Sequence, residues 1–150
     1  MKSKFMGPDG MDSSDLTKIA GKAVVGMYYT SVAGPVTVYP QAKQFADEYK
    51  KKFGKNPEPF AAQAYDATAI LVKAIEAAAK GGKAPSRDAV TAAIRDVKHT
   101  GVTGAVEFDG KGDPKKALYF VLRVTSADPE KWGDNKEVKR LAIAAPALKK

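Results

Sequence analysis

The segment FMGPDGMDSSDL, residues 5–16, decides how the chain begins to fold. Its apolar start runs into Gly-Pro-Asp-Gly, a combination that breaks regular structure and predicts a tight turn. Residues 13–15 (Ser-Ser-Asp) then supply a helix cap and an acidic first turn. We therefore expect a short strand, a turn and a helix in close succession, with the single carboxylate of Asp9 at the junction.

The chain then alternates helical and strand-like patterns. Apolar side chains recur at helical spacing in residues 16–23, 41–53, 60–80 and 86–97. Residues 24–30 are β-branched and aromatic, which favours a short buried strand. This alternation of helices with strands predicts an α/β fold.

The last third changes to the alternating period of a β-sheet. GAVEF (residues 104–108) and ALYFVLRVT (117–125) flank DGKGDP (109–114), and Asp-Gly between such runs predicts a tight β-hairpin. The turn superficially resembles a calcium-binding loop, but Lys111 occupies a ligand position and no terminal glutamate follows, so the hairpin is favoured. The tail after Asp128 gives no prediction.

Composition places the chain among ordinary folded domains. Its 150 residues are 44% hydrophobic and 28% charged, enough for one core, and no apolar run is long enough to span a bilayer. The absence of cysteine excludes disulfides, thiol catalysis and Cys-based zinc sites. The first ten residues have no apolar core of the kind found in signal peptides, so we expect none within them.

The charge of the chain suggests one class of partner, nucleic acid. Twenty-five basic residues against 17 acidic ones give a net charge of +8. The lysines are scattered, however, and the group at residues 50–52 closes an expected helix, where cations complement the helix dipole. No basic run is interleaved with aromatic residues. A solvated surface is favoured, and a basic α/β nucleic-acid-binding domain stands as the alternative hypothesis.

No set of catalytic side chains can be assembled from the sequence. His99 is the single histidine, and we expect it at the surface near the end of a helix. There is no Gly-x-Ser-x-Gly motif and no glycine pattern of a phosphate- or dinucleotide-binding loop. We predict that the chain is not an enzyme, and we expect neither a metal nor a cofactor.

Asp9 is the one carboxylate whose position suggests binding. In open α/β sheets, ligands bind at the carboxyl ends of strands, next to helix N-termini, and Asp9 is predicted to lie at such a place. A carboxylate there suits a small cation such as an α-ammonium group. Turn aspartates also commonly bond to nearby backbone N–H groups, so position alone leaves both interpretations open.

Three segments together resemble the C-terminal part of the periplasmic branched-chain amino-acid-binding proteins, the leucine/isoleucine/valine-type solute receptors of ABC importers. They are FMGPDGMDSSDLTKIAGKAVVGMYYTS (5–31), YDATAILVKAIEAA (65–78) and GAVEFDGKGDPKKALYFVLRV (104–124). The resemblance implies an incomplete type I periplasmic-binding-protein fold, with parts of two Rossmann-like lobes and a C-terminal β-hairpin. It also implies the solute-binding component of an ATP-driven importer, with a branched-chain amino acid held in a cleft between the lobes.

The same resemblance implies how the chain is divided. Residues 1–31 and 117–150 would belong to one lobe and residues 32–116 to the other, with SVAGPVTVYP (31–40) as an extended crossing. Family members are much longer, so the chain looks like a fragment, with further strands and a signal peptide upstream. The receptor would work in the periplasm or at the outer face of the cell membrane, and would deliver its ligand to a membrane permease.

Three residues match ligand positions of the family. The acid of Gly-Pro-acid-Gly holds the ligand's ammonium group in the family pattern, and this position falls on Asp9, where many members have glutamate. Phe60 matches an aromatic residue that lines the cleft from the other lobe, and Tyr65 matches a frequent tyrosine. Because much of each lobe would be missing, we expect the isolated chain to form an oligomer, most simply a dimer, and to lack measurable amino-acid affinity.

Overall fold

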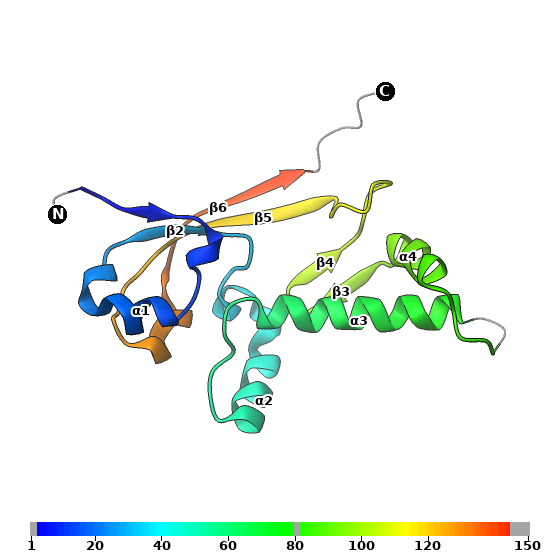
Figure 1. Ribbon diagram of the computed structural model, residues 1–150, viewed down its shortest axis with the longest axis horizontal. Coiled ribbons are helices and arrows are strands. Elements are labelled where there is room, and N and C mark those ends of the chain that lie inside the picture. Colours follow the sequence, from blue (N-terminus) through cyan, green and yellow to red (C-terminus); the bar gives the residue numbers. More distant parts are fainter. Residues whose placement is uncertain (1–2, 80–81, 145–150) are drawn as a thin grey trace.

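The computed structural model describes residues 3–79 and 82–144, which form an α/β fold with two separate sheets (Figure 1). In chain order, with η for a 3-10 helix, the elements are β1 (Met6–Gly7), η1 (Asp9–Met11), α1 (Asp15–Ala20), η2 (Gly21–Val24), β2 (Tyr28–Ser31), η3 (Val36–Val38), η4 (Pro40–Ala42), α2 (Lys43–Phe53), α3 (Ala61–Ala78), α4 (Arg87–Asp96), β3 (His99–Gly101), β4 (Gly104–Val106), β5 (Lys116–Arg123), η5 (Pro129–Asp134) and β6 (Lys136–Ala144). The predicted α/β class is confirmed.

The larger sheet has the strand order β1-β2-β5-β6. β1 runs parallel to β2, whereas β5 is antiparallel to both β2 and β6. α1 and η5 contact each other and lie on the same side of this sheet (Figure 1). The tail that gave no prediction therefore supplies both an edge strand and part of the cover of the sheet.

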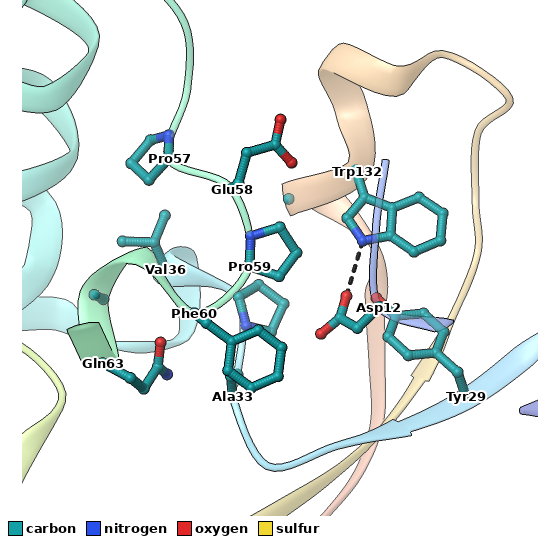
Figure 2. A pocket seen from close by; sticks show the side chains of 14 residues that line it. Asp12, Tyr29, Ala33, Val36, Pro57, Glu58, Pro59, Phe60, Gln63 and Trp132 are labelled. Carbon is teal, nitrogen blue, oxygen red and sulfur yellow. Dashed lines mark hydrogen bonds between the residues drawn. The ribbon is translucent and has the colours of Figure 1, made fainter. Parts of the chain in front are cut away.

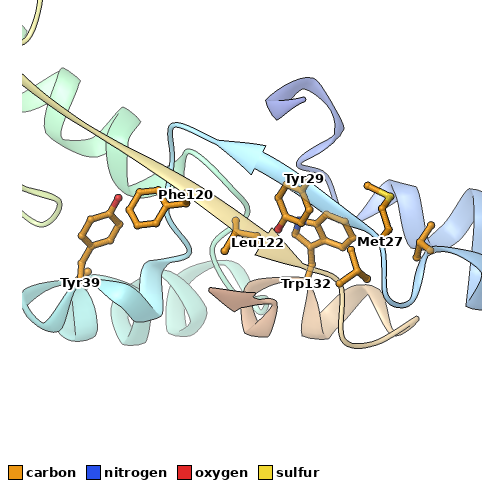
Figure 3. Packing of buried hydrophobic residues seen from close by; sticks show 9 residues of the cluster. Met27, Tyr29, Tyr39, Phe120, Leu122 and Trp132 are labelled. Carbon is orange, nitrogen blue, oxygen red and sulfur yellow. The ribbon is translucent and has the colours of Figure 1, made fainter. Parts of the chain in front are cut away.

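The core lies on one face of this sheet, where η5 and the segment that contains Tyr39 and Ala42 pack against it. Phe120 and Leu122 of β5 are fully buried, while Tyr119 beside them is 40% exposed, which confirms the alternating period. Trp132 of η5 stacks on Tyr29 of β2, with ring centroids 5.5 Å apart (Figure 3). The segments that meet here come from opposite ends of the chain, so the core depends on the C-terminal tail.

The predicted hairpin between residues 104–108 and 117–125 is wrong in its pairing. The tight turn forms, since the Asp109 amide donates to the Asp113 carbonyl at 2.8 Å. Beyond a single isolated bridge the two strands separate, and β4 pairs with β3 while β5 pairs with β2 and β6. An Asp-Gly turn fixes only the local reversal of the chain and does not determine which strands pair beyond it. The antiparallel pair at the C-terminal end of the described chain is β5–β6.

The helices α2, α3 and α4 and the small β3–β4 sheet form the other part of the structure. The ranges predicted for these helices agree with the structure to within a few residues. The strand predicted at residues 24–30 is shifted to β2, because residues 21–24 form the tighter η2. None of the described helices combines the length and apolar character needed to cross a membrane.

Asp66 of α3 joins this helix to the β3–β4 sheet. Its carboxylate is buried and accepts hydrogen bonds from the Val102 amide at 2.9 Å, the Thr103 amide at 2.8 Å and the Thr103 hydroxyl at 2.5 Å. His99 Nε2 lies 3.5 Å from the same carboxylate, and Lys73 Nζ lies 3.0 Å from His99 Nδ1. The expectation that His99 is a surface residue is therefore wrong, because this cluster buries it in β3.

This cluster makes stability depend on pH. Burial raises the pKa of the Asp66 carboxyl, but the hydrogen bonds from Thr103 and Val102 outweigh burial and hold the pKa below its ordinary value of 3.8. The resulting stabilisation is fully present above pH 3.8 and is lost as the pH falls through the lower folded-state pKa. We expect Asp66→Asn to remove this part of the acid sensitivity, measured by urea unfolding at successive pH values. Equal acid sensitivity in both proteins would contradict the assignment.

Much apolar surface remains uncovered in both parts of the structure. Side chains between 40% and 56% exposed are Tyr65, Leu71, Val72 and Ile75 on α3, and Val138, Leu141 and Ile143 on β6. β6 is also a sheet edge. The sheet and α3 therefore have fewer neighbours within the described chain than their apolar side chains could pack against.

Candidate functional site

Asp9 lies where the sequence predicts it, directly after β1 and before α1, as the first residue of η1. The turn is held by its backbone, with the Met11 amide donating to the Pro8 carbonyl at 3.1 Å and the Asp12 amide to the Asp9 carbonyl at 2.9 Å. Within the described residues, the exposed Asp9 carboxylate accepts no hydrogen bond. The interpretation of Asp9 as a turn-stabilising side chain therefore finds no support in its contacts.

Phe60 has an unusual backbone conformation at the start of α3. Among the described residues it is the only one other than glycine with a positive φ, 69°. Left-handed backbone is uncommon for a bulky side chain and persists where the surroundings enforce it. Pro57 and Pro59 fix the approach, and the Ala64 amide donates to the Phe60 carbonyl at 2.8 Å to begin the helix. The ring is 39% exposed and lines a small pocket (Figure 2).

This pocket has a volume of about 20 Å³ and lies between η5 and the approach to α3. Its wall includes the side chains of Asp12, Tyr29, Glu58, Phe60 and Trp132 (Figure 2). A space of this size holds a water molecule and is much too small for an amino acid. The pocket alone therefore cannot be an amino-acid-binding site, and a complete site needs further residues around it.

Asp12 is the buried carboxylate of the pocket, and the sequence analysis missed it. The Trp132 Nε1–H donates to Asp12 Oδ1 and the Ser31 hydroxyl to Asp12 Oδ2, both at 2.8 Å. Burial raises the pKa of the Asp12 carboxyl, and these two hydrogen bonds offset only part of that effect. In the sequence Asp12 stands in a run of cap residues, and its indole partner lies 120 positions away, so no local pattern connects them.

Tyr65 lies on another surface. It is 56% exposed on α3, and its ring centroid is 5.1 Å from that of Phe45. The two line a groove between α2 and α3 together with Tyr49 and Phe53. Neither Tyr65 nor Asp9 lines the pocket that contains Phe60. The structure thus places the three predicted ligand residues at three separate positions. The described residues hold no cluster of three side chains suited to a metal ion.

The strand–turn–helix order around Asp9 and the mixed sheet agree with the predicted family. A sequence profile of the family described as periplasmic binding protein matches residues 2–129. The chain belongs to this family. Among curated members, a leucine-, isoleucine-, valine-, threonine- and alanine-binding protein of Pseudomonas aeruginosa is 36% identical over 124 residues, which are 81% of this chain and 31% of that protein. A Leu/Ile/Val-binding protein homolog of Brucella abortus is 32% identical over 135 residues, 88% of this chain and 34% of that protein.

Solved periplasmic binding proteins have the same fold. A leucine-binding protein from Thermotoga maritima superposes with a TM-score of 0.75 and 28% identity, over 94% of this chain and 38% of that one. A branched-chain amino-acid transporter substrate-binding protein from Streptococcus pneumoniae, solved with isoleucine, gives a TM-score of 0.69 at 23% identity, over 96% of this chain and 38% of that one, and shows the fold alone. The predicted family resemblance and incomplete type I fold are confirmed. The chain spans about a third of the length of the curated relatives it matches.

Proposed function

We propose that this chain is part of the solute-binding component of an ATP-driven amino-acid importer, and that the complete component holds a branched-chain amino acid in a cleft between two lobes. The family and the ligands named for the Pseudomonas and Thermotoga relatives support this proposal. The observation that carries it is the Asp9 carboxylate, which is exposed at a strand–helix junction and is not used by its own turn. Such a carboxylate is suited to an α-ammonium group.

The division into lobes is part of the same proposal. Residues 1–31 and 117–150 form one lobe and residues 32–116 the other. Support comes from the sheets, because the larger sheet takes its strands almost wholly from the first two ranges and the β3–β4 sheet lies within the third. Asp9 and Phe60 then belong to opposite walls, with Asp9 binding the ammonium group and Phe60 contacting the apolar side chain. The receptor works in the periplasm or at the outer face of the membrane and meets a permease there.

Binding tests need both walls of the cleft. They use what we call the extended receptor, in which this chain is joined to the part of the Pseudomonas relative that it does not match, about two thirds of that protein. Titration calorimetry with leucine, isoleucine and valine should show one site per molecule. Absence of binding together with salt-dependent retention of DNA would favour the nucleic-acid hypothesis instead.

Phe60→Ala is expected to weaken leucine binding by about 1–2 kcal/mol, or roughly 5- to 30-fold, because it removes apolar wall and no charge. Smaller ligands such as alanine should lose less, so the preference among side chains should change. Calorimetry of the extended receptor measures both. The control is Phe53→Ala on α2, which removes another exposed phenylalanine ring, 55% exposed against 39% for Phe60, from the groove between α2 and α3 and should leave the affinities unchanged. Equal effects of the two variants would exclude Phe60 from the site.

The 150-residue chain alone is expected to be an oligomer, most simply a dimer, without measurable leucine affinity. The exposed apolar side chains of α3 and the open edge of β6 are surfaces that association covers. Analytical ultracentrifugation at low micromolar concentration, with leucine titration of the same sample, measures both properties. A folded monomer that binds leucine would contradict this prediction.

A further inference from the structure

Asp12 connects three segments that are distant in the sequence. Its own backbone belongs to the turn after η1, where its amide donates to the Asp9 carbonyl at 2.9 Å. Its side chain accepts from Ser31, the last residue of β2, and from Trp132 in η5. A single buried carboxylate therefore joins the turn that carries Asp9 both to the sheet and to the C-terminal tail. Figure 2 shows the bond to Trp132.

Trp132, the residue of the C-terminal tail that contacts Asp12, is itself held in place by its neighbours. Trp132 is 3% exposed and stacks on the Tyr29 ring at an interplanar angle of 21°. The Asn135 side chain donates to the Tyr29 hydroxyl at 3.1 Å, and its oxygen accepts from the Thr125 amide at 3.2 Å. The indole N–H thus has a fixed position against which Asp12 is placed.

The same carboxylate faces the opposite side of the pocket. Phe60 and Glu58 lie in the wall across from Asp12 and Trp132 (Figure 2). The Ser14 hydroxyl, two residues after Asp12, donates to Glu58 at 3.4 Å. The turn that carries Asp9 is therefore also placed relative to the segment that carries Phe60.

We propose that Asp12 is a positioning residue of the amino-acid site. Its hydrogen bonds from Trp132 and Ser31 hold the turn after β1, and so fix where the Asp9 carboxylate stands in the cleft. Asp12 is buried and each of its oxygens already accepts a hydrogen bond from the protein, so we assign it to holding the turn and not to contacting the ligand. The expected effect of Asp12 on ligand affinity rests on the proposed function. Its expected effect on the stability of the turn rests on the geometry alone.

The effect on the turn is measured in the 150-residue chain by NMR, without ligand. Trp132 is the single tryptophan, so its indole N–H gives one signal. Asp12→Ala should move that signal and speed hydrogen exchange of the Met11 amide by on the order of tenfold, since that amide closes the turn. Asp12→Asn keeps an acceptor for the indole and should restore slow exchange. The control is Asp15→Ala, which replaces an exposed carboxylate nearby. It should change neither the position of the Trp132 indole signal nor the exchange rate of the Met11 amide.

The effect on affinity is measured by leucine calorimetry of the extended receptor. A misplaced Asp9 should weaken binding by about 10- to 100-fold in Asp12→Ala, with most of the loss recovered in Asp12→Asn. Variants that bind leucine as the unaltered receptor does, while their turn exchanges faster, would overturn the positioning role. Unchanged hydrogen exchange of the Met11 amide in Asp12→Ala would overturn the positioning role, whatever the leucine affinity. Absence of leucine binding by the unaltered extended receptor would count against the proposed function and not against the effect of Asp12 on the turn.

Discussion

Asp66→Ala is expected to lower the free energy of unfolding of the chain by about 2–4 kcal/mol. The substitution removes the acceptor of the Val102 and Thr103 amides and of the Thr103 hydroxyl, and leaves these donors without partners. It also removes the carboxylate that lies 3.5 Å from the buried His99 Nε2. Urea unfolding followed by circular dichroism, at one protein concentration, measures the loss.

Two further variants test whether the loss of stability comes from the Asp66 cluster or from replacing any aspartate. A Cβ atom at Gly101 would collide with the Asp66 carboxylate, so Gly101→Ala should reproduce much of the loss while Asp66 itself is kept. Asp47→Ala removes an exposed carboxylate paired with Lys43 on α2 and should leave the unfolding midpoint unchanged. If Asp66→Ala and Asp47→Ala unfolded at the same urea concentration, the joining role of Asp66 would be refuted.

Asp9→Ala is expected to weaken leucine binding by the extended receptor by about 2–5 kcal/mol, roughly 30- to 5,000-fold. The reason is that the ligand's ammonium group would be enclosed in the cleft without an anionic partner. The fold should be unaffected, because the Asp9 side chain makes no hydrogen bond among the described residues and its turn is closed by backbone groups. Calorimetry at fixed pH and salt measures the loss.

The controls for this prediction lie close to Asp9. Asp15→Ala removes another exposed carboxylate, which pairs with Lys18 at 2.7 Å on α1, and should leave the leucine affinity unchanged. Asp9→Glu lengthens the side chain by one methylene and keeps the charge, so it should keep most of the affinity. A loss in Asp15→Ala as large as in Asp9→Ala would mean that the total charge of this surface matters and a specific contact does not.

Features that depend on neighbouring residues were predicted well from the sequence. The turn at Asp9 and the helix that follows it were predicted from residues within a dozen positions, and both form. The predicted serine cap does not form as such, because Ser14 at the start of α1 makes no side-chain capping hydrogen bond. The turn at Asp109 is likewise local and forms as predicted. The partners of β5 were not predicted correctly, because β2 and β6 are distant from the Asp109 turn in the sequence and no local pattern identifies them.

Contacts between distant parts of the chain were the ones that sequence analysis missed. Asp12 and Trp132 are 120 positions apart, and the tail that contains Trp132 had no recognisable pattern. His99 was expected at the surface near the end of a helix, and its partner Asp66 lies 33 positions earlier, so no local pattern connected the two residues. A buried polar pair shows no periodicity, so it becomes visible only when the packing of the elements is known.

The most direct test of the central claim, that Asp9 binds the ammonium group of an amino acid, is a calorimetric cycle. It compares leucine with 4-methylpentanoate, which is leucine without its ammonium group, in the unaltered extended receptor and in Asp9→Ala. We predict that leucine binds the unaltered receptor at least 30-fold more tightly than the analogue does, and that this advantage largely disappears in Asp9→Ala. An equal preference for leucine in both proteins would contradict the account.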